Sequence, residues 1–468
     1  MGSEHQNAGI SRRGLLTTAS AVAAGVSVSR SLLGRAKVPR LDDVHVAILG
    51  VGVQGSRLLL SNLHRMKGLR FKAVCDISPY NRVRHYRILK RYGHDVRQFE
   101  DYRQMLAEVK DLDAAIIATP DWVHAEQSIA CMKAGLCVYC EKEMSNDLEQ
   151  ARQMVLTARR TGKLLQIGHQ RRSNLRYLRA LEYIHAQRAL GRITHVKGQW
   201  NRHQALHHAA DKKKVAQLDT ATLKRYGYDT MERFRNWRWY RKFSGGPIAD
   251  LGSHQVDVFN WVLGGVPRAL QATGGNDYYP NTEWYDNASV LYEWECNWQG
   301  RRCVVRGVYQ VLNTTSHGGY FETFLGDEGS LKISENTRVR SGIRREDRAP
   351  RAPWERSKEM RAAMIAAGMK PLDEDDPDAK SKKDDTPKVK PSPDNGRLFP
   401  IPMPEEWAAL PVHLCHLANF FAAVRDPGKV RLACPGEVGF ETAMSVLPVN
   451  EALRTGARIP LKPEQFTA

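Results

Sequence analysis

Apolar and polar positions alternate in blocks between residues 44 and 167, where short apolar runs are separated by stretches of helical periodicity. The apolar runs cover residues 44–49, 71–75, 113–118, 136–140 and 163–167. Strands that alternate with helices in this way indicate βαβ units, which build a mostly parallel sheet. We therefore expect an α/β chain whose first domain covers residues 41–170.

A different pattern begins after Gly191. Strand-like runs at residues 193–199, 289–296, 303–311 and 330–333 follow one another with few helical stretches between them. Such a succession predicts an open sheet that is mostly antiparallel. The sequence thus predicts a second α/β domain over residues 171–468, which returns to helical order at residues 410–424 and 438–454.

Two stretches of the second domain lack the apolar residues that a core requires. Residues 205–232 contain three consecutive lysines, and residues 343–398 are rich in Lys, Asp and Pro. A segment that buries little apolar surface does not offset the conformational entropy lost on folding. We expect residues 343–398 to form an exposed insertion.

Gly50, Gly52 and Gly55 have the spacing G-x-G-x-x-G directly after the first apolar run, and a helical pattern follows them. This placement is typical of a Rossmann domain, in which the pyrophosphate of a dinucleotide binds at a helix N-terminus. Gly50 permits the tight turn, Gly52 lets the backbone approach the phosphates, and Gly55 lets helix and strand pack closely. Val53 and Gln54 complete the turn and belong to the same predicted cofactor site.

Asp76 follows the second apolar run. At this position an acidic side chain can accept hydrogen bonds from the ribose hydroxyls of the adenosine. The residue therefore favours NAD over NADP as the cofactor.

Residues 1–40 have the pattern of a targeting segment. Arg12 and Arg13 precede a weakly hydrophobic stretch of small residues, and further basic residues follow it. This pattern resembles a twin-arginine signal, which predicts a protein exported by that machinery to the periplasm or the cell envelope. An organellar presequence and a disordered basic tail are the alternatives. The A-x-A-like site at residues 21–23 lies inside the apolar stretch, so an uncleaved anchor also remains open.

The 468 residues carry a formal net charge of +19, which is high enough to consider nucleic acid as a partner. Basic residues are nevertheless spread among acidic ones, without a recognition-helix pattern or zinc-finger spacing. His203, His207 and His208 have no companion cysteine or carboxylate at ligand spacing. Several of the eight cysteines stand in or beside apolar runs, where buried free thiols are expected. We therefore predict neither a nucleic-acid partner nor a bound metal.

Two further motifs stand at the ends of predicted parallel strands. Thr119, Pro120 and His124 follow the run at 113–118, and Glu141 and Lys142 follow the run at 136–140. Open α/β sheets bind ligands at the carboxyl ends of their strands. We assign all five residues to the cofactor site.

Asp250, His254 and Asp257 recur at i, i+4 and i+7 spacing, so they are expected to share one face of a helix. A histidine four residues after an aspartate is, taken alone, more often a surface pair or a cap. Its occurrence together with the lysine motif and the glycine turn favours a catalytic site.

With these motifs the chain resembles the Gfo/Idh/MocA family, the group of glucose–fructose oxidoreductase and inositol dehydrogenase. The resemblance runs from residue 44 to nearly the C-terminus and implies a Rossmann domain joined to an open-sheet domain. Lys142 matches the lysine of the family's E-K-P motif, in which Glu143 replaces the proline here. Asp250 and His254 match its D-x-x-x-H pair. The resemblance further implies an NAD(P)-dependent oxidoreductase that assembles into homo-oligomers.

Oxidation of a secondary alcohol requires a base for the hydroxyl proton and a cation for the developing alkoxide. We expect His254 to be the base and Asp250 to orient it or to bind a neighbouring hydroxyl. The family resemblance implies that Lys142 bridges the cofactor and the reacting oxygen.

Gln170, Arg171, Trp237 and Asp257 are the candidate substrate contacts. Gln170 and Arg171 lie in a stretch that resembles the family's border of the nicotinamide and the substrate. Trp237 stands among arginines and other aromatic residues that would form a sugar-stacking wall, with aromatic core packing as the alternative.

The leading interpretation is a nicotinamide-dependent oxidoreductase that acts on a secondary hydroxyl of a sugar, glycoside or cyclitol. The alternative is a redox-neutral NAD-dependent glycosidase, which oxidises a ring hydroxyl, eliminates the aglycone and reduces the product again. A cofactor restored in this way would suit an exported enzyme, because nicotinamide is not recycled outside the cytoplasm. A non-enzymatic sugar sensor is a third possibility, against which the lysine motif and the Asp/His pair argue.

Overall fold

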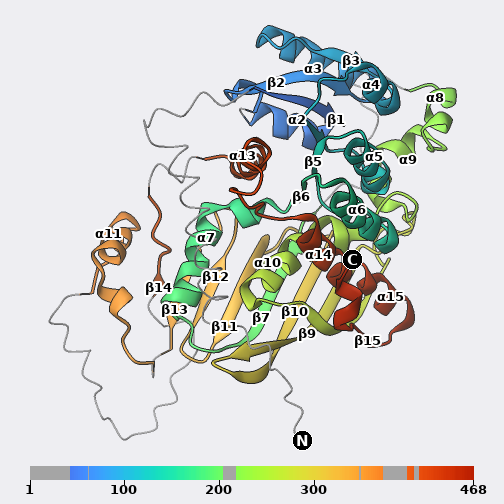
Figure 1. The fold of residues 1–468 in the computed structure, drawn as a ribbon. Coiled ribbons are helices and arrows are strands. Elements are labelled where there is room, and N and C mark those ends of the chain that lie inside the picture. The colour runs from blue at the N-terminus through green and yellow to red at the C-terminus, as the bar shows by residue number, and fades with distance from the viewer. Residues whose placement is uncertain (1–42, 62, 204–217, 347–348, 373–397, 405–409) are drawn as a thin grey trace, which may run out of the picture.

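The computed structural model describes residues 43–61, 63–203, 218–346, 349–372, 398–404 and 410–468. The predicted leader, residues 1–40, lies outside these ranges, as do residues 204–217 and 373–397. Two β-sheets with their helices organise the described chain, and Figure 1 shows the two parts joined one above the other.

The first sheet has six strands in the order β3-β2-β1-β4-β5-β6, and every neighbouring pair is parallel. This is the strand order of a doubly wound Rossmann domain, in which the ligand crevice lies beside β1. The elements are β1 Val44–Leu49, α2 Val53–Leu60, β2 Leu69–Cys75, α3 Pro79–Arg91, β3 Arg97–Phe99, α4 Tyr102–Glu108, β4 Ala114–Ile117, α5 Asp121–Lys133, β5 Cys137–Cys140, α6 Leu148–Thr161 and β6 Leu165–Ile167. The predicted parallel α/β domain is confirmed.

The second sheet has nine strands in the order β14-β13-β12-β11-β7-β10-β9-β8-β15. Its neighbours are antiparallel except for β7 and β10, which are parallel. The predicted open and mostly antiparallel sheet is therefore also confirmed. The strands are β7 Ile193–Asn201, β8 Pro267–Gly275, β9 Asn287–Trp298, β10 Arg301–Leu312, β11 Tyr320–Gly326, β12 Gly329–Ile333, β13 Gly342–Arg345, β14 Leu398–Phe399 and β15 Ile459–Pro460, and the helices are α7 Leu175–Leu181, α8 Thr220–Arg225, α9 Met231–Arg235, α10 Ser253–Leu263, α11 Lys358–Ala366, α13 Val412–Arg425, α14 Gly436–Val446 and α15 Pro448–Thr455.

The two faces of the second sheet differ. On one face α10 packs against the strands, and its Phe259 makes edge-to-face contacts with Trp294 and Phe324. On the other face Leu291 and Val308 pair directly across β9 and β10 and are 56% and 43% exposed. Apolar residues therefore remain accessible on the face that α10 does not cover.

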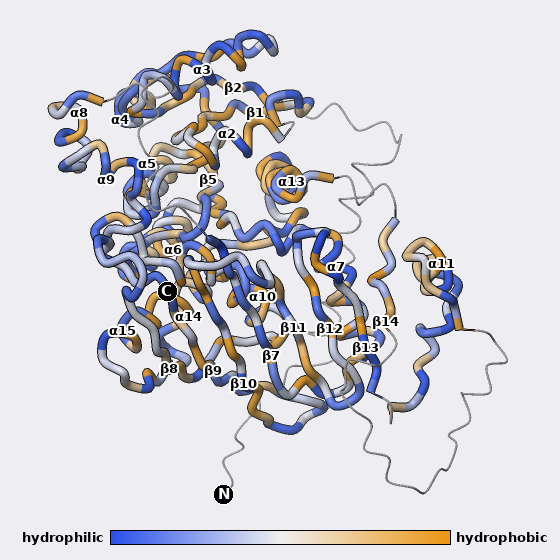
Figure 2. Tube along the Cα trace, turned by 180° about the vertical axis from the view of Figure 1, so that it is seen from behind, coloured by the Kyte–Doolittle hydropathy of each residue, from blue (hydrophilic) through white to orange (hydrophobic). Residues whose placement is uncertain are grey.

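Helix α13 returns from the C-terminal part of the chain to the first sheet. Its Leu417, Phe420 and Phe421 join a buried cluster with Ile116 and Tyr139 of β4 and β5. Figure 2 shows this helix coloured largely as hydrophobic, near β5. One helix from the C-terminal part of the chain therefore packs on the first sheet.

Residues 343–398 are not wholly exposed, contrary to the prediction. Trp354, Met360 and Met364 are buried in the core, and β13 pairs with β12. The two methionines stand four residues apart on α11, so they share one apolar face although charged residues surround them in sequence. The lysine-rich and aspartate-rich residues 373–397 lie outside the described ranges.

The helical pattern predicted at residues 438–454 divides into α14 and α15. Pro448 is the first residue of α15, a position that needs no backbone N–H donor. All eight cysteines are free thiols, and those at 75, 131, 140 and 434 are buried. Within the described ranges, no helix combines the length and the apolarity that crossing a bilayer would require.

Candidate active site

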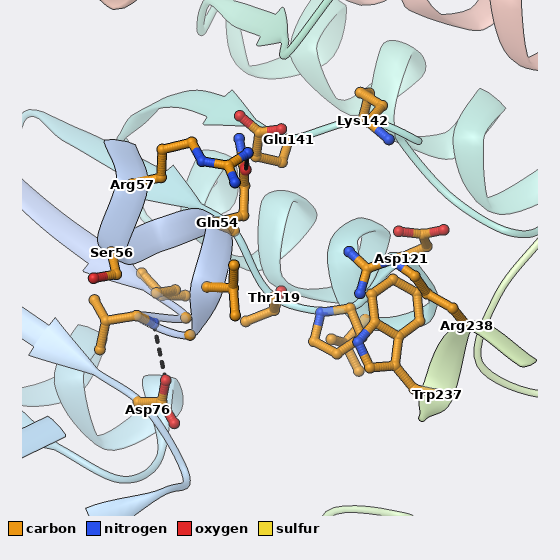
Figure 3. A pocket seen from close by; sticks show the side chains of 18 of the residues that line it. Gln54, Ser56, Arg57, Asp76, Thr119, Asp121, Glu141, Lys142, Trp237 and Arg238 are labelled. Carbon is orange, nitrogen blue, oxygen red and sulfur yellow. Dashed lines mark hydrogen bonds between the residues drawn. The ribbon is translucent and has the colours of Figure 1, made fainter. Parts of the chain in front are cut away.

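A cavity of about 1480 Å³ is lined by residues from both domains. The first domain contributes the turns that follow β1, β2, β4 and β5, and the second contributes β7, the segment Ile248–Gly252 and α10. Figure 3 shows Asp76 at one end of the cavity and Lys142, Asp121, Trp237 and Arg238 at the other. We call these the Asp76 end and the Lys142 end.

The glycine turn meets the spatial demands of a dinucleotide site. Gly50 has a φ of +79°, which favours glycine, and a Cβ placed on Gly55 would stand 1.9 Å from the Gly50 oxygen. A Cβ on Gly52 would meet no atom within 4 Å, because this residue faces open space where α2 begins without a side-chain cap. Uncapped N–H groups at a helix N-terminus bind phosphate. Val53 and Gln54 also line the cavity.

Asp76 is held at its end of the cavity by two backbone donors. Its Oδ2 accepts from the N–H of Val51 at 2.9 Å, and its Oδ1 accepts from the N–H of Ser78 at 2.8 Å. Burial raises the pKa of Asp76 above its ordinary value, although the Ser78 and Val51 N–H groups oppose the rise. Each oxygen keeps a further lone pair with which it can accept a hydrogen bond from a ribose hydroxyl.

The cavity is lined by three further residues that were predicted to contact the cofactor, Thr119, Pro120 and Glu141. The predicted contact His124 is not part of the lining. The His124 ring is buried, with Nε2 at 2.7 Å from the Thr119 carbonyl and Nδ1 at 2.8 Å from the Glu143 carbonyl. Burial lowers its pKa to about 4. His124 therefore joins two turns of the cavity wall to one another, and it does not itself line the cavity.

Lys142 reaches from the first domain to the second. Its Nζ donates to the backbone oxygen of Asp250 and lies 3.4 Å from Oδ1 of the same residue. Arg238 Nε donates to Asp250 Oδ1 at 3.1 Å, and Arg202 Nη2 lies 3.5 Å from Oδ2. Burial would raise the pKa of Asp250, but Arg238, Lys142 and Arg202 outweigh it and hold the pKa below its ordinary value. Asp250 is thus an ionised carboxylate among three cations.

His254 lines the same end of the cavity, in the first turn of α10. Its ring lies 5.5 Å from that of Trp200, and its buried Nδ1 has no hydrogen-bond partner in the part of the chain that the structure describes. Burial holds the pKa of His254 well below its ordinary value, and the charges of Lys142 and Arg171 lower it further. The ring is therefore neutral near pH 7, so one of its nitrogens carries a free lone pair.

The expected orientation of His254 by Asp250 is not observed. The carboxylate of Asp250 contacts Lys142, Arg202 and Arg238, and the described contacts include no hydrogen bond from it to His254. Asp250 lies in a segment of π-helix, Ile248–Gly252, rather than on the α-helix that the spacing predicted. It positions the lysine and the two arginines instead.

Gln170 and Trp237 line the cavity, as a substrate contact requires. Arg238 stacks on the ring of Trp237 at 4.2 Å. The neighbouring Trp239 and Tyr240 are buried in a cluster with Phe243. Of the predicted sugar-stacking wall, one part therefore lines the cavity and the other part belongs to the core.

Arg171 and Asp257, the other two predicted substrate contacts, are buried and do not line the cavity. The buried guanidinium of Arg171 pairs with Glu322 and with Glu335, whose Oε2 lies 2.8 Å from Nε. Asp257 accepts from Arg172 Nε at 2.8 Å in the interior. Both residues hold the core behind the site, since buried charges are retained when they are paired.

Asp121 is a cavity residue that the sequence reasoning missed. It is 3% exposed, its Oδ2 has no hydrogen-bond partner within the described chain, and it lines the Lys142 end. Burial raises its pKa to about 7, although Lys142 and Arg238 oppose the rise. The available signal was its position directly after Pro120, in a turn already assigned to the cofactor.

No group of three or more His, Cys, Asp and Glu side chains is arranged to hold a metal ion among the residues that the structure describes. His203 is described, whereas His207 and His208 are not.

The fold, the glycine turn and Asp76 together define an NAD-dependent oxidoreductase. Residues 44–169 match the family described as "Oxidoreductase family, NAD-binding Rossmann fold", and residues 178–332 match the "GFO/IDH/MocA C-terminal domain". The chain belongs to the Gfo/Idh/MocA family.

Parts of this chain are similar in sequence to named proteins. A 2,7-anhydro-N-acetylneuraminate hydratase from Mediterraneibacter gnavus is 24% identical over 327 residues, which are 64% of this chain and 77% of that protein. An inositol 2-dehydrogenase from Rhodococcus erythropolis is 31% identical over 152 residues, which are 32% of this chain and 42% of that protein. The WlbA dehydrogenase of Bordetella pertussis, solved with NADH and UDP-GlcNAcA, superposes with a TM-score of 0.60 at 18% identity over 90% of this chain and 99% of that chain. This likeness supports the fold.

Proposed function

We propose that the enzyme oxidises a secondary hydroxyl of a sugar, glycoside or cyclitol, with NAD⁺ as the hydride acceptor. The observation that carries the proposal is the meeting of Lys142, Asp250 and His254, from two domains, at the end of the cavity opposite Asp76. The inositol 2-dehydrogenase is a relative with this kind of chemistry.

The proposed roles follow from charge and protonation. NAD⁺, held by the glycine turn and Asp76, would supply the acceptor for the carbinol hydrogen as hydride. Neutral His254 takes up the hydroxyl proton, so that the alcohol becomes a ketone. The ammonium of Lys142, fixed by Asp250, stabilises the negative charge that builds on the hydroxyl oxygen. Because the Lys142 and His254 side chains are largely buried, water is excluded from them and their electrostatic interactions with the substrate are stronger than in solvent.

The experiment incubates the full-length protein with NAD⁺ and a panel of sugars, glycosides and inositols, and follows NADH. Lys142→Met and His254→Asn are each expected to lower turnover by about 100-fold or more. Lys133→Met at the exposed end of α5 and His195→Asn on the exposed side of β7 are matched controls that keep the wild-type rate. Unchanged turnover in the Lys142 and His254 variants would contradict the proposal.

A redox-neutral glycosidase is the second candidate. The relative from Mediterraneibacter gnavus is a hydratase by name, and addition of water leaves the oxidation state of a substrate unchanged. In this alternative the transient ketone acidifies the neighbouring C–H, the aglycone leaves, water adds and the hydride returns to the sugar. Release of nitrophenol from a nitrophenyl glycoside, with solvent deuterium entering that C–H and no net NADH, would select it over the dehydrogenase.

We further propose that the protein is exported through the twin-arginine route and retains its NAD. Residues 1–40, which carry Arg12 and Arg13, support the export. Denaturation of the purified protein followed by quantification of NAD and NADH tests the retention. Nucleotide well below one per chain would contradict it, and an intact N-terminus on protein confined to the cytoplasm would contradict the export.

We also propose a homo-oligomer that covers the exposed face of the second sheet. Leu291 and Val308 are the apolar residues that support this choice of face, since large exposed apolar pairs commonly mark an interface. The partner is a second copy of the chain.

A further inference from the structure

Lys142 and three arginines of the second domain give the cavity wall a high density of positive charge. Lys142, Arg202, Arg235 and Arg238 all line the cavity, and three of these four cations share the single carboxylate of Asp250. Glu335 and Asp121 also line the cavity, but buried Arg171 offsets the charge of Glu335, and burial raises the pKa of Asp121 to about 7.

Arg235 stands out among these cations. It is the last residue of α9, two positions before Trp237, and it lines the cavity. Its Nε and Nη2 are buried and have no hydrogen-bond partner within the described chain. A buried donor without an acceptor destabilises the protein until a ligand supplies one.

Arg238 presents a second guanidinium in a defined orientation. Its Nε is held by Asp250 at 3.1 Å, and its plane lies over the ring of Trp237 at 4.2 Å. The side chain remains 43% exposed, which leaves its terminal nitrogens accessible from the cavity. A guanidinium anchored on one side in this way is preorganised for a planar two-oxygen acceptor.

The anionic part of the cofactor does not account for this charge. Its pyrophosphate belongs at the glycine turn, where Gly52 and the start of α2 face open space. The oxidised nicotinamide ring carries a positive charge of its own, so its binding adds positive charge at the Lys142 end.

We propose that the substrate is an anionic sugar whose carboxylate binds Arg235 and Arg238 while its reacting hydroxyl meets Lys142 and His254. This inference rests on the proposed function and specifies its substrate class as uronic acids or their glycosides. The planar carboxylate matches the fork of a guanidinium better than a neutral hydroxymethyl group does.

The test compares uronic acids with their parent hexoses, as methyl glycosides of the gluco, galacto and manno series. Binding to the NAD-loaded, full-length protein is measured by calorimetry, and turnover is followed in parallel. At least one uronide is expected to bind about tenfold or more tightly than its parent hexoside, as one charge-assisted contact provides. Arg235→Gln should remove that preference and leave the affinity for the neutral hexoside within about twofold.

Arg241→Gln is the matched control. Arg241 lies on the same segment, but it bonds to Glu283 and does not line the cavity, so its loss should leave the preference intact. Equal or tighter binding of all neutral hexosides overturns the proposal, as does tighter binding of a sulfate ester in place of the carboxylate. Weaker NAD binding in Arg235→Gln would assign the residue to the cofactor and overturn it too. If no sugar supports hydride transfer, the proposed function is rejected. The preference for uronides is measured separately by calorimetry, so the two proposals can fail independently.

Discussion

Asp250 organises the reacting end of the cavity because a single buried carboxylate holds cations from three segments. Lys142 comes from the first domain, whereas Arg202 and Arg238 come from two parts of the second. Paired in this way, each cation keeps one position relative to the others. The contact between Lys142 and Asp250 therefore fixes how the two domains present their functional groups to one another.

Asp121 is expected to govern the pH dependence of turnover. The folded protein keeps the proton of this carboxyl up to a pKa of about 7, far above that of an exposed aspartate, because burial disfavours the charged form. As pH rises from 6 to 8 the carboxylate forms, and its negative charge at the Lys142 end favours the protonated form of His254, the proposed base, so oxidation should become about tenfold faster. In Asp121→Asn the rate should be flat over this range, which a pH profile of kcat/KM checks.

Glu143→Gln is the control for this profile. Burial also raises the pKa of Glu143, to about 8, but the residue does not line the cavity. Its variant should keep the wild-type rise near pH 7. A rise that persists in Asp121→Asn would assign the titration to another group, although not to His254, whose pKa lies well below 6.5.

The sequence predicted Lys142, Asp250 and His254 as site residues because each belongs to a local motif. It did not predict Asp121, since the burial of that carboxyl depends on the domain packed above it. The position of Arg171 in the core was not predicted for a related reason. Its carboxylate partners, Glu322 and Glu335, lie more than a hundred residues away in sequence, so its pairing in the core was not visible.

At the scale of elements, the turn between β1 and α2 contains two glycines of the same motif that are needed for different reasons. A Cβ on Gly55 would collide with the backbone of Gly50, whereas a Cβ on Gly52 would enter open cavity. Gly55 is thus required by packing, and Gly52 by the ligand.

Alanine at each glycine should therefore give different results. Gly55→Ala is expected to destabilise the fold, by roughly 3 kcal/mol or more as other overpacked sites do. Gly52→Ala should leave the melting temperature nearly unchanged and weaken NAD binding about tenfold or more, because its methyl group occupies space proposed for the phosphates. Thermal melting and NAD calorimetry on both variants make the comparison, and equal NAD affinity of Gly52→Ala and wild type would refute this role of Gly52.

Local patterning predicted the strands whose residues keep a simple apolar run, and it missed others for physical reasons. Strand β11 was missed because Glu322 interrupts its apolar pattern, and that carboxyl is buried through its pairing with Arg171 and a hydrogen bond from Tyr177. Strand β3 is three residues long and buries only Phe99. In both cases the element depends on distant partners more than on its own sequence.

At the scale of the whole molecule, the face of the second sheet away from α10 determines the expected assembly. Leu291→Lys places a charge at the centre of the proposed interface and should weaken self-association about tenfold or more. Light scattering over a range of concentrations measures this. Ile365→Lys on α11, where the wild-type residue is 62% exposed, is the control that should not change the assembly. A wild-type protein that is monomeric at all concentrations would refute the oligomer.

The return of α13 to the first sheet has a consequence for the order of events during synthesis. The ribosome synthesises β1 to β6 long before residues 412–425. Until then, Ile116 and Tyr139 lack the aromatic side chains of α13 that cover them in the folded protein. The first domain is therefore covered completely only after residues 412–425 have been synthesised. Expression of residues 41–170 alone would leave that apolar surface exposed, so the first domain depends on a helix that is synthesised after the strands of the second sheet from β7 to β14.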